Sequence, residues 1–476
     1  MDGRHHRWHT CGIRSLLAAP YLRGSRRREV LKVKQGAIPQ GVADEEAYPN
    51  TRVAWTAVGV LLLLYALAFV DRQIISLMVG SVRADLGVSD FQIGLLQGFA
   101  FALLYALFGL PLGLAVDRLN RRRVIFVGVI VWAAAATACG LARTFPELLA
   151  ARLLVGAGEA ALAPAAYSML SDLFPKKRLT LALSIFTIGA QLGASLSLAI
   201  GGFIVEAAKD GVTLPILGAV SAWRFAFLVT GLPGLGLAFL VFLIPEPVRR
   251  GAGKFSGTWR ELFIFLRTNI RFFACHFLGF SCIMAMAYAR LAWLPTYFQR
   301  HFGWPVGQIG LVLAVFGFVT GALALPLTGA IVDRWYSRGI ADAHFRFYVY
   351  GGIVATVCGT ACFLMPTPTL FFILAGLATI PLGMAAIAAG AIQIVTPPAL
   401  RGRMSAIYLL FTGLAALTVG PAIVGVFTDL VFKDDALIHL SLASSNLVLG
   451  PIATLAFILG LAPMRRAVAA ANLRNE

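Results

Sequence analysis

The stretch that decides the fold is GVSDFQIGLLQGFAFALLYALFGLPLGLAVDR, residues 87–118, which recurs without a gap as GWPVGQIGLVLAVFGFVTGALALPLTGAIVDR, residues 303–334. The short runs QIGL and G-x-x-V-D-R keep one spacing in both copies and stand near the two ends of an apolar segment. Each copy is long enough to cross a bilayer core, which takes about 20 helical residues. The repeat therefore indicates a membrane protein built from two related halves.

The composition of the whole chain is also typical of an integral membrane protein. Of its 476 residues, 59% are hydrophobic and 13% are charged, whereas about a quarter of the residues of a soluble domain are charged. Six apolar runs lie between Val53 and Ile244, and six more lie between Phe272 and Leu461. The runs are continuous and do not alternate like the strands of a membrane β-barrel. The sequence predicts an all-α integral membrane protein with twelve transmembrane helices.

The spacing of the repeat predicts how these helices are grouped. Six spans separate the two copies, so both halves enter the bilayer in the same orientation and are related by an axis along its normal. We therefore expect two pseudo-symmetric six-helix bundles around a central path. The expected parts are a basic, disordered cytoplasmic tail (1–52), an N-terminal bundle (53–244), a cytoplasmic linker (245–271), a C-terminal bundle (272–464) and a second cytoplasmic tail (465–476).

The net charge of +18 is explained by the position of the basic residues, without a nucleic-acid partner. If the N-terminus is cytoplasmic, the inner loops hold eighteen Lys and Arg residues and the outer loops hold six, without the tails. Cytoplasmic loops are enriched in Lys and Arg, so we expect both termini in the cytoplasm. The expected location is the inner membrane of a bacterium. An organellar membrane stays open, because the Arg-rich first 28 residues superficially resemble a mitochondrial presequence.

Four charged residues fall within or beside the apolar spans. A charge in such a place costs at least about 2.5 kcal/mol, yet Asp71 is followed by Arg72, and Arg152 precedes Glu159 by two helical turns on the same face. One interpretation is that these charges only neutralise one another and pin the first helix to the fourth. The other is that Asp71 or Glu159 carries a proton, alternating between protonation and pairing with arginine. The four residues then form a proton-coupling network.

Polar side chains elsewhere in the spans suggest where a substrate binds. An apolar cavity with a few polar anchors fits an amphipathic molecule, and Arg290 is placed either to bind an anionic head group or to snorkel to the interface. The candidate substrate-binding residues are Arg72, Arg152, Tyr65, Gln191, Tyr288, Arg290 and Trp293.

Opposite charges also cluster at the predicted cytoplasmic ends of the helices. Asp117 ends the second span beside a run of arginines, and Asp172 ends the fourth. Helix C-termini attract cations, so this cluster predicts a gate that closes when the cavity faces outward. A role in topology alone is the alternative. The predicted gate consists of Gly113, Asp117, Arg118, Arg121, Arg122, Asp172 and Arg178, with Gly329, Asp333 and Arg334 in the second half.

The loop GLAVDRLNRRR, residues 113–123, resembles the signature loop of the major facilitator superfamily, although Asn120 stands where that family often has a small residue. Within the superfamily, RLLVGAGEA (152–160), SDLFP (171–175) and the pair Asp71-Arg72 resemble the spinster family. The resemblance implies the major facilitator fold and secondary active transport by alternating access. Spinster-like proteins imply proton-coupled transport of a lysophospholipid or a sphingoid phosphate.

Other functions compete with this interpretation. A proton-coupled carrier of small organic acids or drugs would use similar polar residues, and a non-transporting scaffold or receptor is an alternative of another class. The six cysteines are scattered, and the spans hold no catalytic pairing or metal-ligand spacing, so we expect no enzyme, no metal and no cofactor. No Gly-rich phosphate loop ending in Lys-Ser or Lys-Thr is present, so an ion gradient must supply the energy. The expected partners are the substrate, protons and the bilayer, with the chain as a monomer.

Overall fold

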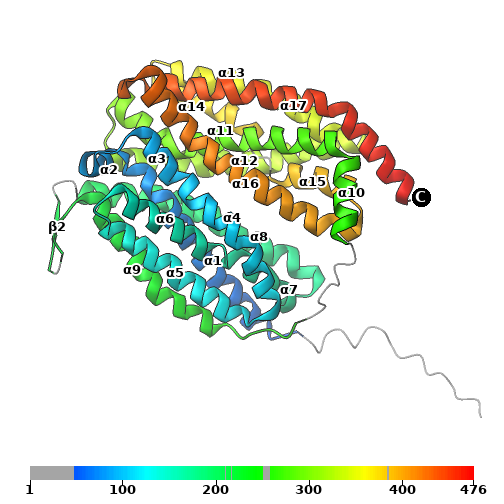
Figure 1. The fold of residues 1–476 in the computed structure, drawn as a ribbon, viewed down its shortest axis with the longest axis horizontal. Coiled ribbons are helices and arrows are strands. Elements are labelled where there is room, and N and C mark those ends of the chain that lie inside the picture. Colours follow the sequence, from blue (N-terminus) through cyan, green and yellow to red (C-terminus); the bar gives the residue numbers. More distant parts are fainter. Residues whose placement is uncertain (1–47, 209–210, 216, 250–257, 383–384, 476) are drawn as a thin grey trace, which may run out of the picture. The chain divides into compact units, whose positions relative to one another are not determined.

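The structure, a computed structural model, describes residues 48–208, 211–215, 217–249, 258–382 and 385–475 (Figure 1). Most of the predicted N-terminal tail and part of the predicted linker lie outside these residues. Within them, twelve helices are long and apolar enough to cross a bilayer, which confirms the predicted number of spans. Their orientation in the membrane stays a prediction.

The first half of the chain is helical apart from one short hairpin. Its elements are α1 (Thr51–Gln73), η1 (Ile74–Leu77), α2 (Val79–Leu86), α3 (Asp90–Gln97), α4 (Phe99–Arg118), α5 (Arg121–Leu141), α6 (Phe145–Glu159), α7 (Leu162–Leu173), α8 (Lys176–Ala207), β1 (Val212–Leu214), β2 (Gly218–Val220), α9 (Ala222–Leu237) and η2 (Ala238–Leu243). The strands β1 and β2 pair antiparallel, with Thr213 opposite Ala219. The sequence patterns did not indicate this hairpin.

The part of the chain from Trp259 onward starts with α10, a short amphipathic helix in the predicted linker, and continues with the helices of the second half. Its elements are α10 (Trp259–Thr268), α11 (Ile270–Phe302), α12 (Val306–Ser337), α13 (Ala343–Ala361), η3 (Cys362–Leu364), α14 (Pro368–Thr379), η4 (Ile380–Leu382), α15 (Ala385–Val395), η5 (Pro398–Leu400), α16 (Arg401–Val426), η6 (Phe427–Phe432), η7 (Asp435–Leu437) and α17 (Ile438–Asn475). Here η6 is a π-helix and the other η elements are 3₁₀ turns.

Three spans of the first half are interrupted near charged or repeated residues. The first span changes from α-helix to 3₁₀ directly after Gln73, next to Arg72. The second is divided between α3 and α4 at Gly98, and the fourth between α6 and α7 directly after Glu159. Changes of helix type inside a span often mark functional hinges. Two of these interruptions thus lie at the charges that the sequence singled out.

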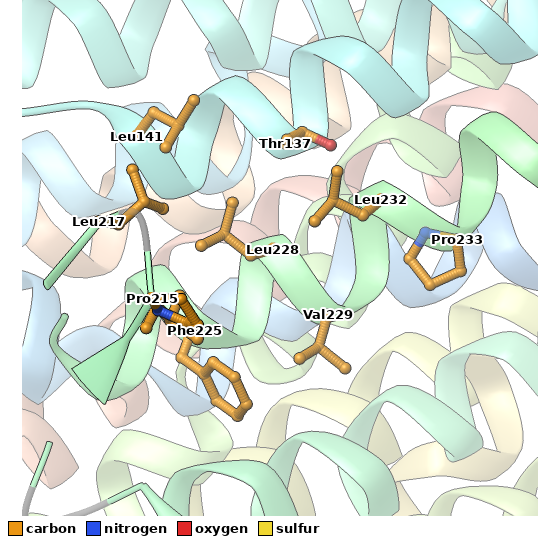
Figure 2. A pocket seen from close by; sticks show the side chains of 10 residues that line it. Thr137, Leu141, Pro215, Leu217, Phe225, Leu228, Val229, Leu232 and Pro233 are labelled. Carbon is orange, nitrogen blue, oxygen red and sulfur yellow. The ribbon is translucent and has the colours of Figure 1, made fainter. Parts of the chain in front are cut away.

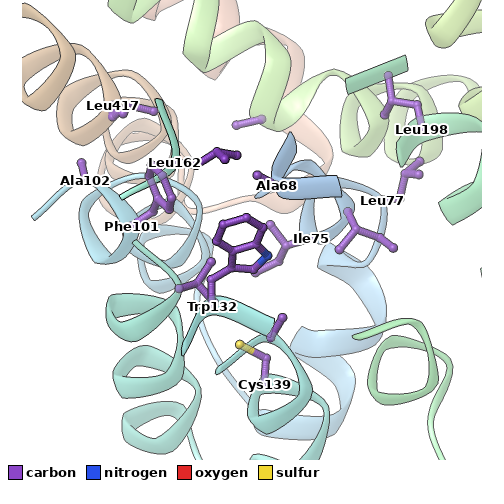
Figure 3. Packing of buried hydrophobic residues seen from close by; sticks show 14 of the residues in the cluster. Ala68, Ile75, Leu77, Phe101, Ala102, Trp132, Cys139, Leu162, Leu198 and Leu417 are labelled. Atoms are coloured by element: carbon purple, nitrogen blue, oxygen red, sulfur yellow. The ribbon is translucent and has the colours of Figure 1, made fainter. Parts of the chain in front are cut away.

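The core of the first half is built around Trp132, which is fully buried. Figure 3 shows its indole among Ala68 and Ile75 of the first span, Phe101 of α4 and Leu162 of α7. Large aromatic side chains contribute much of the buried apolar area of a core. Four spans are therefore held together at the depth where the buried charges lie.

The two halves meet along two pairs of helices. In one pair α3 packs against α16, and in the other α12 packs against α8. The segments α3–α4 and α12 are the two copies of the sequence repeat, so each copy contacts the opposite half. Asp90 and Arg118 lie at opposite ends of the second span, and we refer to the corresponding ends of the molecule as the Asp90 end and the Arg121 end. In Figure 1, α2, α3 and β2 lie at the first, and α7 and α10 lie at the second.

Candidate functional site

Arg72 and Glu159 form an ion pair between α1 and α6. The Arg72 Nη2 atom lies 2.5 Å from Glu159 Oε2, and the side chain of Glu159 is almost completely buried. A charge in this environment is costly unless it is paired. The pairing neutralises both charges, although Arg72 Nε and Glu159 Oε1 have no hydrogen-bond partner among the described residues, and it joins two of the four residues predicted to form a charge network.

Aromatic rings surround the Arg72 guanidinium. Its central carbon lies 4.5 Å from the ring centre of Phe69, 4.0 Å from that of Phe101 and 5.5 Å from that of Tyr105. A cation over an aromatic face gains electrostatic stabilisation, and the gain increases when water is excluded. Arg72 is therefore held by a carboxylate and an aromatic cage, which we call the Arg72 cage (Phe69, Phe101 and Tyr105). Sequence reasoning did not find these rings, because nothing marks them among the many aromatic residues of the spans.

Arg152 is completely buried and takes a different role from Arg72. Its guanidinium donates hydrogen bonds to backbone carbonyl oxygens of Asp71 at 3.0 Å, Arg72 at 3.1 Å and Leu96 at 3.4 Å. The last carbonyls of a helix have no partner within it, and Arg152 satisfies two of them where α1 ends. Arg152 and Asp71 do lie together, as predicted from their depth, but the contact is to the backbone of Asp71.

The carboxylate of Asp71 is fully buried. In the described part of the chain no group donates a hydrogen bond to either oxygen within normal geometry, although Thr230 and Trp132 lie close enough to interact with it. A buried carboxylate without donors is costly as an anion and far less costly as a neutral acid. Asp71 is thus the least satisfied member of the four-charge set.

A small polar pocket opens beside the ion pair. It is lined by Arg72, Gln73 and Gln97 of the first half, and by Tyr288, Leu291, Ala292, Leu417 and Pro421 of the second. Gln73 also donates a hydrogen bond from its side chain to the Leu291 carbonyl at 2.9 Å. This pocket therefore lies between the halves and exposes the cation to a space that both of them line. Gln73 and Gln97 are functional candidates that the sequence patterns did not separate from other amides.

An apolar cavity of about 330 Å³ adjoins the polar pocket. Tyr288 and Leu291 line both spaces. The remaining wall comes from the second half alone, and it consists of Met284, Ala287, Leu382, Ala389, Ser405, Tyr408, Leu409, Thr412 and Gly413. The described lining residues offer hydroxyl groups as their only polar side-chain groups, so a cationic group stands next to a largely apolar space.

The other predicted substrate-binding residues lie in different surroundings. Tyr65 stacks on Phe186 with ring centres 4.7 Å apart, and Gln191 donates weakly to the Gly317 carbonyl at 3.4 Å. Arg290 and Trp293 are buried. Arg290 donates to the Ala375 carbonyl at 3.2 Å and Trp293 to the Pro421 carbonyl at 2.9 Å. Of the seven candidates, Arg72 and Tyr288 line the two spaces described above.

A second and larger pocket, of about 650 Å³, lies between α5, α9 and the hairpin (Figure 2). Thr137 supplies the one hydroxyl group of its lining, and the labelled neighbours such as Leu141, Phe225 and Leu232 are apolar. None of the described residues that line it is charged. The pocket offers nothing that would orient a polar substrate, so the candidate site is the pair of spaces at Tyr288.

Part of the predicted gate forms a buried cluster at the Arg121 end. Arg121 is fully buried and pairs with Asp172 at 2.5 Å and with Glu246 at 2.8 Å. It also donates to the Pro247 carbonyl at 2.6 Å, and Arg122 donates to the Ile244 carbonyl at 2.9 Å. The structure thus brings together α5, α7 and the start of the linker. Sequence reasoning missed Glu246, because a lone acid after a span has no partner that spacing identifies.

The remaining gate residues are not gathered into that cluster. Arg118, Arg178, Asp333 and Arg334 are exposed, and the side chain of Asp117 lies outside the described residues. A Cβ atom on Gly113 or on Gly329 would meet nothing within 4 Å. In the second half a different acid, Asp342, is buried and pairs with Arg346 at 3.0 Å and with Arg465 at 2.9 Å. Among the described side chains, the buried ion pairs near these loops are thus made by acids other than the repeated Asp, namely Asp172 and Asp342.

The comparisons with known proteins agree with this architecture. The sequence matches the profile of the Major Facilitator Superfamily over residues 61–396 and 277–474. An MFS-type efflux pump of Mycolicibacterium smegmatis is 28% identical over 85% of this chain and 90% of its own length. The protein spinster of Drosophila melanogaster is 25% identical over 84% of this chain and 66% of its own, and spinster homolog 3 of Danio rerio is 32% identical over about half of each.

A solved structure supports the same fold. It is a bacterial homolog of the human lysosomal transporter Spinster in an inward-facing, unoccupied conformation, and it superposes with a TM-score of 0.71. The alignment has 22% identity and covers 89% of this chain and 98% of that one. Together with the twelve helices, these matches identify an integral, multi-pass membrane protein with two pseudo-symmetric halves. The chain belongs to the Major Facilitator Superfamily of secondary transporters and is similar to the spinster proteins within it.

Proposed function

We propose that the chain moves an amphipathic anionic or zwitterionic lipid with one acyl chain, such as a lysophospholipid or a sphingoid phosphate, by proton-coupled alternating access. The observation that carries this proposal is the junction at Tyr288 and Leu291, where the polar pocket of Arg72 meets an apolar cavity of about 330 Å³. An acidic head group would be attracted to the Arg72 guanidinium. The acyl chain would lie in the apolar cavity, where burial is favourable.

The proton-coupling role rests on the two carboxyl groups nearest to Arg72. Glu159 neutralises Arg72 in the absence of substrate, and an anionic head group would compete with it for the same cation. Once displaced, a buried carboxylate is strongly disfavoured, and a proton would remove that penalty. Asp71, which accepts no hydrogen bond from the described residues, is the second proton carrier that we propose. Arg152 holds the end of α1 in place while these pairings change.

The remaining assignments follow the proposed cycle. Asp172, Arg121 and Arg122 are proposed as the gate at the Arg121 end, which the basic loops place in the cytoplasm together with both termini. The bundles are taken as 53–244 and 272–464, with the linker 245–271 between them. The inner membrane of a bacterium and a monomeric state complete the proposal.

A direct test is flux through purified protein in liposomes. Lysophospholipids and sphingoid phosphates of several chain lengths would be supplied with and without a pH gradient, and Asp71→Asn and Glu159→Gln would be compared with the wild type. The expected result is gradient-driven flux that both substitutions uncouple while insertion and purification are retained. Unchanged coupling in both variants would remove the proton-carrier assignment.

A filled cavity tests where the acyl chain lies. Gly413 lines the apolar cavity, and a Cβ atom there would meet nothing within 4 Å, so Gly413→Leu occupies the cavity without displacing protein atoms near its Cβ. Flux of long-chain substrates should fall more than that of short-chain ones. Gly376→Leu is the matched control, because Gly376 also has open space and lies outside the cavity. Equal loss for all chain lengths would contradict the proposed position of the acyl chain.

The second candidate is a carrier of small organic acids or drugs. It is favoured by relatives such as the MFS-type efflux pump of Mycolicibacterium smegmatis and a probable L-galactonate transporter of Escherichia coli, which is 26% identical over 62% of this chain. Such substrates need the Arg72 pocket but not the apolar cavity. Flux of small anions that is insensitive to Gly413→Leu, without flux of any lipid, would decide for this function.

A further inference from the structure

Another buried acid, Asp90, lies at the end of the molecule opposite to Arg121. It is the first residue of α3 and is fully buried. Arg300 of the second half binds both of its carboxylate oxygens, at 2.5 and 2.9 Å, and Arg83 lies 3.3 Å from it. Two parallel hydrogen bonds between a guanidinium and a carboxylate are strong and specific in geometry. The proposed transport site does not use any of these residues.

Two further acids of the second half complete this cluster. Asp435 pairs with Arg83 and lies 3.9 Å from Arg300. Asp429 accepts hydrogen bonds from the backbone N–H groups of Asp90 at 3.3 Å and of Phe91 at 2.6 Å. The first N–H groups of a helix lack partners within it and attract negative charge. An acid of one half therefore caps a helix of the other.

The backbone that carries Asp429 has two uncommon features. Asp429 lies in the π-helix η6. Lys433, the first residue after that helix, has a positive φ of 55°, and no other non-glycine residue in the described ranges has a positive φ. π-helical turns and left-handed non-glycine residues are rare and often occur at functional sites. The π-helix and the left-handed Lys433 thus end the regular helix next to α3, at the position where Asp429 contacts the first residues of α3.

Glycines bring the two halves into backbone contact beside the cluster. A Cβ atom on Gly94 of α3 would lie 2.8 Å from the Pro421 carbonyl oxygen of α16, and one on Gly310 of α12 would collide with the Leu198 carbonyl of α8. Gly94 and Gly310 are the same position of the repeated QIGL motif. Small residues allow helices in a membrane to approach closely. The repeat therefore supplies one close contact for each of the two helix pairs that join the halves.

Among the described residues, the ion pairs between the halves lie at this end. Within the described ranges, the two ion pairs that cross between the halves, Arg300 with Asp90 and Arg83 with Asp435, both belong to the Asp90 cluster. We propose that the Asp90 cluster and the glycines Gly94 and Gly310 form the closure of the Asp90 end, and that loss of the Asp90 charge opens this end. The proposal rests on the alternating-access cycle proposed above, because that cycle requires each end to open in turn.

The three acids also lie close enough together to be considered for a metal ion. Asp90 and Asp435 are already engaged by Arg83 and Arg300. The carboxylate of Asp429 accepts hydrogen bonds from backbone N–H groups of α3. The three carboxylates are therefore bound by arginines and backbone N–H groups, and these contacts fit a cluster that holds the two bundles together.

Hydrogen–deuterium exchange of the full-length protein in lipid nanodiscs tests the proposal without any substrate. In Asp90→Asn, exchange of the backbone amides of α3 and of residues 427–437 should become about a hundredfold faster, the change expected when a buried ion pair loses one partner. Amides around Arg121 at the opposite end should keep their rates. Asp429→Ala and Gly310→Ala should show the same pattern in the segments of the Asp90 end.

Two matched controls accompany these variants. Asp85→Asn removes an ion pair at the same end, but its partner Arg224 belongs to the same half. Gly317→Ala lies on the same helix as Gly310, where a Cβ atom meets nothing within 4 Å. The proposal would be overturned if the exchange rates at the Asp90 end were the same in Asp90→Asn as in Asp85→Asn. It would also be overturned if exchange became faster to the same extent at both ends, because this indicates general destabilisation of the fold. Because the readout needs no substrate, a failed lipid-flux assay leaves this result interpretable.

Discussion

Replacing Glu159 by Gln should destabilise the protein, because it leaves the buried cation Arg72 without its partner. The ion pair is 2.5 Å long and Glu159 is 3% exposed. Removing one member of a buried pair costs about 3–5 kcal/mol. The aromatic rings of the Arg72 cage still stabilise the cation, which places the expected loss near the lower limit, at about 3 kcal/mol. With an unfolding entropy of about 2 cal/mol/K per residue, the thermal midpoint of a unit of this size should fall by roughly 3 °C.

Asp71→Asn is the comparison that makes this prediction sharp. Asp71 is as deeply buried as Glu159, but its oxygens accept no hydrogen bond from the described residues, and Arg152 binds only its backbone carbonyl. The neutral amide should therefore change the free energy of unfolding by less than about 1 kcal/mol. Thermal unfolding of both variants and the wild type in one detergent gives the measurement. If Asp71→Asn loses as much stability as Glu159→Gln, the reasoning from hydrogen-bond partners is refuted.

Four further substitutions test other parts of the structure. Arg121→Gln should cost about 3–5 kcal/mol in unfolding experiments, because the fully buried guanidinium pairs with two carboxylates; an unchanged thermal midpoint would refute this. Desolvation opposes ionisation of Asp85, but hydrogen bonds from Arg224, Trp223 and Ser221 outweigh it and hold the Asp85 pKa below its ordinary 3.8. The ionised Asp85 carboxylate therefore stabilises the folded state at a pH above its unfolded pKa. This stabilisation is lost as the pH falls through the lower pKa of the folded state. The thermal midpoint of Asp85→Asn should therefore fall less steeply than that of the wild type below about pH 4. Gly193→Ala should destabilise by about 1–3 kcal/mol, since its Cβ would lie 2.7 Å from the Phe69 Cβ, whereas Gly59→Ala, which has open space around it, should stabilise α1 by about 0.5–1 kcal/mol. Chemical unfolding should give these two variants opposite signs.

The sequence predicted the parts of this protein that depend on the cost of placing charge in lipid. A bilayer span must be long and apolar, so the number of helices follows from hydropathy, and the structure confirms twelve. The same cost makes isolated charges informative. Arg72 and Glu159 stand out in apolar runs, and the structure pairs them. Arg152 and Asp71 also come together, although through a carbonyl group that no residue pattern identifies.

The charges outside the spans were much harder to place from sequence. Asp90 follows a turn, and nothing in its neighbourhood indicates that it is buried by an arginine of the other half. Glu246 with its partner Arg121, and Asp342 with its distant partner Arg465, have the same property, since these pairings depend on how helix ends meet in space. Arg290 and Trp293, which the sequence places among the candidate substrate-binding residues, hydrogen-bond to neighbouring carbonyls in this structure, and their role in binding stays a prediction. Composition reveals that a polar group needs a partner, and only packing determines which one.

The apolar cavity is lined by residues from Met284 to Gly413, and so it belongs to the second half, whereas the buried acids Asp71 and Glu159 belong to the first. On the proposed division of labour, the second half selects the acyl chain, whereas the first half holds the head-group cation Arg72 together with the carboxyl groups that carry the proton. Mutations that reshape the cavity wall would leave the coupling apparatus intact, so new cargoes can arise in evolution without a new energy source. A chimera that joins the first half of one transporter to the second half of another should therefore keep Glu246 and Pro247 with the first half, because both bind Arg121.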